Sequence, residues 1–217
     1  ASTAQIQTAR TQTARTQTTK PATTVKPAPS GVVTPLSNYT IRPTSRTVPQ
    51  ILAIGSSTGG PQALFTLMKG LGIDWNLPTV ITQHMPPTFT SILAKHIQET
   101  SGRPCIEAHG GEILEPGHTY VAAGGYHMLF ERKAGRVVTV RSDAEPENFC
   151  KPAVDPMMRS LVSVYGAKVL AVILTGMGQD GAKGCEAVVE ADGTVFSQDE
   201  STSVVWGMPA AVAKRGL

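Results

Sequence analysis

Short apolar runs alternate with amphipathic stretches along residues 51–217. The runs are nearly continuous in Val, Ile, Leu and Ala, which is typical of strands buried on both faces of a parallel sheet. Between them, apolar residues recur at helical spacing, as Leu64, Leu67, Met68 and Leu71 do. The pattern predicts strands at residues 51–54, 78–83, 119–123, 128–131, 137–141, 168–175 and 194–197, and helices that start near Pro61, Pro87, Pro152, Ala182 and Met208.

This order of elements predicts the fold class. Strands that alternate with helices indicate an α/β domain, doubly wound, with a mainly parallel sheet and helices on both faces. Between Thr119 and Arg141 three strands follow one another without room for helices. That stretch predicts an antiparallel hairpin region, inserted in the sheet or lying at its edge.

Residues 1–50 differ from the rest of the chain in pattern and charge. They contain six basic residues, no acidic residue, six prolines and a direct repeat of Thr-Ala-Arg-Thr-Gln, and they would bury too little apolar surface to offset the entropy of ordering. We expect a disordered linker or tail at 1–50, in preference to a binding arm, and one domain at 51–217. The domain holds 13 basic and 16 acidic residues, so nothing indicates nucleic-acid binding.

Cysteine usage and hydropathy indicate in which cellular compartment the protein is expected. Cys105, Cys150 and Cys185 cannot all pair with one another, and their spacing matches no zinc motif, so we expect reduced thiols and a cytoplasmic protein. No apolar run is long enough to span a bilayer, and the Thr/Gln/Arg-rich start of the chain lacks the apolar core of a secretory signal.

The turn at residues 55–60 carries the first candidate chemistry. Its sequence, Gly-Ser-Ser-Thr-Gly-Gly, lies between a predicted strand and a predicted helix and fits the G-x-S-x-G elbow, which presents a nucleophilic serine, here Ser57. A phosphate cradle is the alternative. It is disfavoured because Pro61 stands where a phosphate-binding loop has Lys, and because Ser57 stands where a dinucleotide-binding loop has Gly.

A serine needs a base and an orienting carboxylate before it becomes nucleophilic. His84 is the favoured base because it follows a strand directly, and sites of open α/β sheets form at the carboxyl ends of strands. Asp180 follows another strand in a Gly-rich loop and is the favoured carboxylate, although a helix cap is an equally ordinary use of Asp there. The weaker alternatives are His96, His109, His118 and His127 for the base and Asp155 and Asp192 for the acid.

Five blocks of sequence together resemble the catalytic domain of the bacterial chemotaxis protein-glutamate methylesterases (CheB-type). The resemblance runs from about Ile51 to Leu217. The blocks are Gly55-Ser56-Ser57-Thr58-Gly59-Gly60-Pro61, Gln83-His84-Met85-Pro86, Pro152-Ala153-Val154-Asp155, Leu174-Thr175-Gly176-Met177-Gly178-Gln179-Asp180-Gly181-Ala182 and Gln198-Asp199-Glu200 with Gly207-Met208-Pro209.

The resemblance implies an activity and a set of roles. Members of the family hydrolyse γ-glutamyl methyl esters on the cytoplasmic domains of chemoreceptors, releasing methanol, and many also deamidate receptor glutamines. It implies Ser57 as nucleophile, His84 as base, Asp180 as orienting acid, the Met177 N–H as an oxyanion donor and Thr58 in the same pocket. No metal and no cofactor is implied, and a phosphorylatable receiver domain normally precedes the linker.

The chain departs from the family pattern at two places. Many members carry His where Cys150 stands, at a position expected to line the substrate cleft, so Cys150 bears on substrate preference. The family usually continues past the equivalent of Leu217, so we expect a truncated chain. A binding module that holds a phosphate or a receptor tail without turnover is the alternative outside the enzymes.

Overall fold

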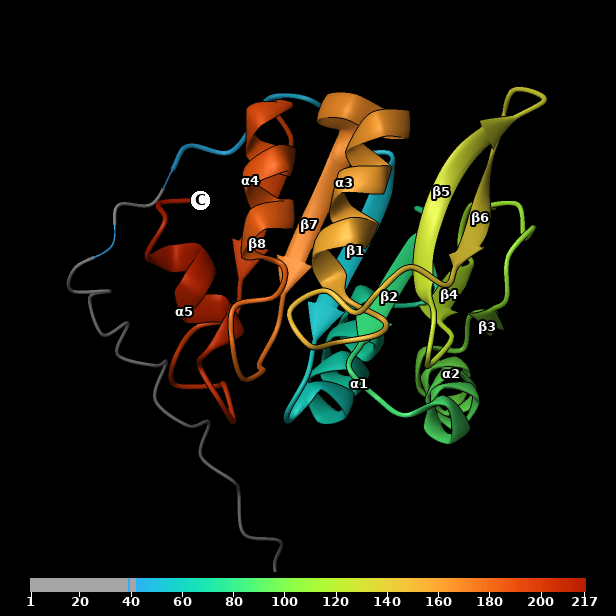
Figure 1. Cartoon of the computed structure of the whole chain (residues 1–217), viewed down its shortest axis with the longest axis horizontal. Helices are drawn as coiled ribbons and strands as arrows, with labels where there is room; N and C mark the ends of the chain where they lie inside the picture. Colours follow the sequence, from blue (N-terminus) through green and yellow to red (C-terminus); the bar gives the residue numbers. More distant parts are fainter. Residues whose placement is uncertain (1–38, 40–41) are drawn as a thin grey trace, which may run out of the picture. The chain divides into compact units, whose positions relative to one another are not determined.

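The computed structural model of the chain describes Tyr39 and residues 42–217, and the compact unit that contains the sheet runs from Asn38 to Leu217. The tail predicted at 1–50 therefore lies mostly outside the described residues and stays a prediction. The helices are α1 (Gly60–Leu71), α2 (Pro87–Ser101), α3 (Val154–Tyr165), α4 (Ala182–Glu190) and α5 (Met208–Ala213), with a 3-10 turn at Gly166–Lys168 (Figure 1). The strands are β1 (Ile51–Ser56), β2 (Thr79–Gln83), β3 (Cys105–Ala108), β4 (Thr119–Ala122), β5 (His127–Lys133), β6 (Arg136–Ser142), β7 (Val169–Ile173) and β8 (Thr194–Ser197).

Six of the strands form one sheet in the order β3-β4-β2-β1-β7-β8, and every pair in it is parallel. The chain leaves β1 towards β2 on one side and later returns to β7 on the other side. The strand order therefore reverses at β1, which is where open α/β sheets place their binding sites. The predicted α/β class with a mainly parallel sheet is confirmed.

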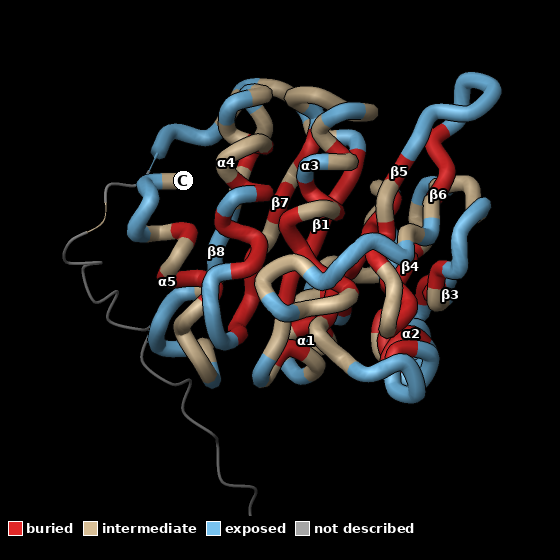
Figure 2. The backbone as a smooth tube through the Cα atoms, viewed as in Figure 1, coloured by how far each residue is buried: buried red, intermediate tan, exposed pale blue. Residues whose placement is uncertain are grey.

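Helices cover both faces of the sheet, as predicted. Ile51 and Ala53 of β1 belong to the core under α3, α4 and α5, whereas Leu52 and Ile54 belong to the core under α1 and α2. Alternate residues of one strand point to opposite faces, so a strand covered on both sides must be apolar throughout. Figure 2 shows β1 buried along its length, and the burial explains the continuous apolar runs of the sequence.

The expectation for residues 119–141 is correct for two of the three strands. β5 and β6 form a separate antiparallel pair, closed by Ala134 and Gly135, which both have positive φ. β4 is the exception because it lies inside the main sheet, parallel to both β2 and β3. Proximity to the hairpin in sequence made β4 look antiparallel, whereas its pairing partners precede it in the chain.

Strand β3 (Cys105–Ala108) was not predicted. It has only four residues, and two of them, Ile106 and Glu107, are exposed or partly exposed because β3 is the edge strand of the sheet. A short edge strand needs no long apolar run, so its sequence carries little signal. Within the described part of the chain, no helix has the length and apolarity to cross a bilayer.

Candidate active site

Strands β1, β2 and β7 are neighbours at the point where the strand order reverses, and one predicted site residue follows each of them. Ser56 pairs with Gln83 in the register of β1 and β2, so Ser57 and His84 continue from neighbouring strand ends. The N–H of Ser57 donates to the carbonyl of Thr175, which follows β7 (3.0 Å), and five residues later the loop reaches Asp180. The structure thus gathers the three residues at one edge of the sheet.

The turn after β1 has the close packing expected of a nucleophile elbow. Gly59 has φ 78° and caps α1, which starts at Gly60 with Pro61 in its first turn. A side chain at Gly176 would place its Cβ 2.7 Å from the Cβ of Ser57 and 2.4 Å from the Sδ of Met208. The loop after β7 therefore lies directly against Ser57, and only glycine fits at position 176.

His84 and Asp180 form a tightly held pair. The Nε2 atom of His84 lies 2.7 Å from Oδ2 of Asp180, whose residue is 2% exposed. Asp180 also accepts hydrogen bonds from the backbone N–H groups of Val154 (2.6 Å), Asp155 (3.1 Å) and Gly181 (3.0 Å). These donors fix both carboxylate oxygens, so the carboxylate can orient the imidazole without moving.

The pKa values of the pair follow from these contacts. Burial opposes ionisation of Asp180, but hydrogen bonds from His84 and from the N–H groups of Val154 and Asp155 outweigh it and lower the carboxyl pKa. Burial also opposes protonation of His84, yet its contacts with Asp180 and Cys150 raise the imidazole pKa to about 9. These contacts therefore favour the protonated form of His84 more than water favours that of a free imidazole.

The second nitrogen of His84 faces a thiol. Nδ1 lies 3.4 Å from Sγ of Cys150, and among the described residues no hydrogen bond joins the Ser57 hydroxyl to His84. Because Asp180 engages Nε2, Nδ1 is the nitrogen that remains to accept a proton from a nucleophile. Cys150 thus occupies the position beside the base that a serine hydroxyl must reach, a contact that the sequence analysis did not foresee.

Gln83 and Asn148 position the site, and the sequence analysis missed both. The Nε2 group of Gln83 donates to the carbonyls of Ser57 (2.9 Å) and His84 (3.0 Å), so one side chain ties the two strand ends together. The Nδ2 group of Asn148 donates to the carboxylates of Asp155 (2.8 Å) and Asp180 (2.9 Å). Gln83 adjoins His84 in sequence and offered a signal, whereas Asn148 is 32 residues from Asp180 and offered none.

The residues implied to hold an oxyanion lie beside Ser57. Met177 follows Gly176, which packs against Ser57, and its side chain is 75% exposed. Within the described residues, the backbone N–H of Met177 donates to no protein acceptor, so it is available to a ligand. Thr58 is exposed, and its carbonyl accepts a hydrogen bond from the Thr175 hydroxyl (2.9 Å), which anchors the turn to the β7 loop.

The alternative residues have other contacts. The ring of His96 packs edge-on against Phe65, and His109 and His118 lie near Glu107 and Glu115 respectively. His127 accepts through Nδ1 from the N–H of Ala153 (3.1 Å) and donates through Nε2 to the carbonyl of Glu145 (3.0 Å). Asp192 lies in a turn with φ 64°. Asp155 is buried next to Asp180, where burial and the neighbouring carboxylate raise its pKa, and it accepts from the N–H of Gly184 (2.6 Å).

The donor atoms of His84, Cys150 and Asp180 lie within 4.8 Å of one another, close enough to be considered as metal ligands. The carboxylate of Asp180 already accepts from five protein donors, and Nε2 of His84 is one of them. A metal ion would have to displace these contacts, so the three residues do not suit a metal.

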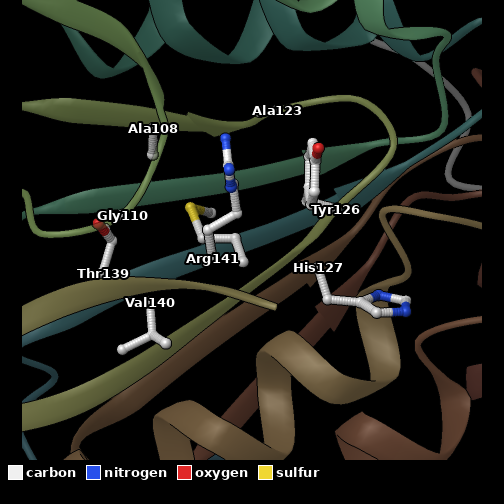
Figure 3. A pocket seen from close by; sticks show the side chains of 9 residues that line it. Ala108, Gly110, Ala123, Tyr126, His127, Thr139, Val140 and Arg141 are labelled. Atoms are coloured by element: carbon white, nitrogen blue, oxygen red, sulfur yellow. The ribbon is translucent and has the colours of Figure 1, made fainter. Parts of the chain in front are cut away.

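A small pocket lies apart from these residues, beside the β5–β6 hairpin. Arg141 stacks over the ring of Tyr126 at 4.2 Å in this region, and Figure 3 shows both side chains at the pocket wall with His127 to one side. None of Ser57, His84 or Asp180 lines it. The hairpin pocket is therefore a feature separate from the candidate active site.

The fold and the site define a class: an α/β domain with a mainly parallel sheet that brings Ser57, His84 and Asp180 together at its switch point, in a chain order that differs from that of the α/β-hydrolase superfamily. Residues 52–217 match the CheB methylesterase family, and the chain belongs to that family. A solved structure with the same fold is the catalytic domain of CheB methylesterase from Thermotoga maritima, which has a TM-score of 0.76 and 40% identity and is matched over 78% of this chain and 90% of that one.

Full-length relatives carry more specific names. The chain is 54% identical over 179 residues to the protein-glutamate methylesterase/protein-glutamine glutaminase of Nitrobacter hamburgensis, covering 82% of this chain and 47% of that protein. It is 56% identical over 170 residues to the protein of the same name from Azospirillum brasilense, covering 78% and 43%. The chain spans about half the length of these relatives.

Proposed function

We propose that this domain is a serine hydrolase that removes methyl groups from γ-glutamyl methyl esters of chemoreceptors and also deamidates receptor glutamines. The observation that carries the proposal is the His84–Asp180 pair, 2.7 Å apart and fixed by buried donors, beside Ser57 at the switch point of the sheet. Family membership and the names of the relatives support the substrate class.

The proposed reaction is a two-step acyl transfer. Ser57 attacks the ester carbonyl while Nδ1 of His84 takes its proton, and the oxyanion is held by N–H donors that include Met177. His84 then gives the proton to methanol as it leaves. Water, activated by the same base, releases the carboxylate and restores Ser57. An amide substrate follows the same path with ammonia as the leaving group.

Cys150 is the rival nucleophile because its Sγ lies 3.4 Å from Nδ1 of His84. Ser57 is favoured since it alone lies in the glycine-lined turn beside the free Met177 N–H, where an oxyanion formed on its substrate would be met. Comparing Ser57→Ala with Cys150→Ala decides between them. We expect Ser57→Ala to abolish hydrolysis and Cys150→Ala to retain it; the reverse pattern would assign the reaction to the thiol.

The test is methanol release from membranes that carry a methylated chemoreceptor. The Ser57→Ala domain should release none while its melting temperature stays near that of the parent, because Ser57 is a partly exposed turn residue. A serine-directed phosphonate should label Ser57. A binding module without turnover would release no methanol and take no label, and that result would contradict the proposal.

The setting in the cell is part of the same proposal. We propose that the domain works in the cytoplasm on the cytoplasmic parts of chemoreceptors, and that a receiver domain joined through residues 1–50 controls it. The length of the relatives, about twice that of this chain, leaves room for such a domain. Methanol release by a chain with and without a phosphorylated receiver would test the control.

A further inference from the structure

A strained two-residue turn lies beside the catalytic base. Glu147 and Cys150 exchange two backbone hydrogen bonds (3.2 and 2.9 Å), which leaves Asn148 and Phe149 as the central residues of a tight hairpin turn. Both have positive φ, 54° at Asn148 and 62° at Phe149. A turn of this kind prefers Asn followed by Gly, so the aromatic residue stands where glycine is expected.

The two central residues differ in the contacts that offset the cost of their positive φ. Asn tolerates the left-handed region, and the Asn148 side chain makes two hydrogen bonds to buried carboxylates. Phe149 has no such compensation, because its side chain is fully exposed (105%) and packs against nothing in the described part of the chain. A bulky residue in a strained conformation without internal contacts points to a contact outside the chain.

The turn is held rigidly against the reacting groups. Cys150 touches Nδ1 of His84, and the carboxylate of Glu147 accepts two hydrogen bonds from Arg159 on α3 (2.9 and 2.6 Å). Asn148 binds Asp180, the partner of the same histidine. Phe149 is thus presented to solvent one residue away from a contact of the base.

Two other exposed apolar side chains lie on the Ser57 side of the site. Met177 (75% exposed) follows Gly176, which packs on Ser57. Val204 (69% exposed) lies against the turn that holds Ser57, because a Cβ added at Gly59 would be 2.6 Å from the Cβ of Val204. We call Phe149, Met177 and Val204 the apolar rim, because each is exposed and lies next to a residue that contacts or adjoins Ser57 or His84.

We propose that Phe149 is an anchor for the protein substrate: it packs against apolar side chains of the polypeptide that carries the esterified glutamate. The proposal rests on the proposed function and deepens it by naming a specificity determinant of the same site. Burying a Phe side chain on binding offsets the strain of the turn, and a rigid aromatic anchor loses little entropy when it binds.

The test compares a large and a small substrate for Phe149→Gly. Because glycine adopts positive φ freely, this variant should melt at or above the parent temperature. Its kcat/KM on membranes with a methylated chemoreceptor should fall ten- to a hundredfold, the range expected for about 1.5–3 kcal/mol of lost apolar burial. Its kcat/KM on p-nitrophenyl acetate, which is too small to reach the rim, should stay near that of the parent, so the ratio of the two rates should drop about ten- to a hundredfold.

Matched variants separate the outcomes. Phe149→Leu should restore most of the receptor activity, and Val48→Gly, which removes an exposed apolar side chain ahead of β1 at the opposite edge of the sheet, should leave the ratio unchanged. An equal loss on both substrates, or no change in the ratio, overturns the anchor. The anchor is also overturned if the parent domain sediments as a dimer and Phe149→Gly sediments as a monomer, because Phe149 would then contact a second copy of the chain. A parent domain that hydrolyses neither substrate contradicts the proposed function instead.

Discussion

Asp180 combines an electrostatic and a structural role in one carboxylate. Its two oxygens accept from His84, from Asn148 and from three backbone N–H groups. The alternative that the sequence left open, a cap of the helix that follows Asp180, is not what the structure shows, because Gly181, not Asp180, is the N-cap of α4. Asp180 instead accepts from the N–H groups of Val154 and Asp155, the first two residues of α3. The carboxylate that contacts His84 therefore also joins α3, the start of α4 and the Asn148 turn.

This dual role predicts two effects for Asp180→Asn. In the amide, an NH₂ group replaces one carboxylate oxygen and would face the N–H donors that now surround Asp180. We expect kcat to fall by about 10⁴, as in other triads whose acid is replaced by its amide. The free energy of unfolding should also fall, by about 1–3 kcal/mol for a buried donor left unpaired. Steady-state methanol release and urea denaturation measure the two. A few-fold loss of kcat with the full loss of stability would reduce Asp180 to a cap.

The raised pKa of His84 predicts how the rate depends on pH. The base must be neutral to take a proton, and its pKa of about 9 means that kcat/KM should climb with pH up to that value. Cys150→Ala removes one of the contacts that raise the imidazole pKa, so the rise should occur at lower pH. A profile of kcat/KM from pH 6 to pH 10 for both proteins checks this; identical profiles would show that the thiol does not act on the base.

The same shift predicts how stability depends on pH. Folding raises the His84 pKa from 6.5 to about 9, so the native state binds the proton more tightly than the unfolded chain does. This contribution is fully present below pH 6.5 and is lost as the pH rises through about 9. The difference between the urea midpoints at pH 6 and pH 9.5 measures this loss of stability. The difference should be smaller for His84→Gln than for the parent. An unchanged loss in His84→Gln would assign it to other groups.

At the scale of elements, the site depends on the loop between β7 and α4 packing on the turn between β1 and α1. Gly176 is the point of closest approach, because a Cβ there would collide with Ser57 and Met208. Both loops are glycine-rich in the sequence, and both were predicted to lie at strand ends. Their mutual contact was not predictable from the sequence, since it depends on β7 adding to β1 on the side away from β2.

Gly176→Ala tests that contact. The methyl group must push Ser57 and the side chain of Met208 apart, so we expect a loss of about 1–3 kcal/mol in stability, as for overpacking, and at least a tenfold loss in kcat. Gly178→Ala in the same loop is the control, because its Cβ would meet nothing within 4 Å, although its φ of 89° costs some stability. Equal losses of kcat in both variants would contradict the argument from contact.

At the scale of the whole molecule, the described unit starts before the sheet does. Tyr39 packs edge-on against Trp206 with ring centroids 5.7 Å apart, and the N–H of Gln50 donates to the carbonyl of Lys168 (2.8 Å). Trp206 lies in the segment that hydrogen-bonds to Gly176 through Val205 and Gly207. The segment before β1 therefore contacts the same loops that support the site.

This predicts different outcomes for two truncations. A chain that starts at Asn38 should keep its melting temperature and its rate of methanol release, because the unit around the sheet begins there. A chain that starts at Ile51 loses the Tyr39–Trp206 pair, worth about 0.5–1.5 kcal/mol beyond its buried area, and should melt several degrees lower. Equal melting temperatures would show that residues 38–50 add nothing to the fold.

The sequence alone determined the helices, every strand except β3, the fold class, and Ser57, His84 and Asp180 as candidate site residues. Apolar periodicity and turn chemistry are local, and the carboxyl ends of parallel strands lie at the same end of a sheet. Tertiary structure decided what is not local. It placed β4 inside the sheet, brought Cys150 to within 3.4 Å of Nδ1 of His84, and drew Asn148 to two carboxylates far along the chain. These contacts depend on which strands and loops become neighbours, and spacing along the chain does not encode that.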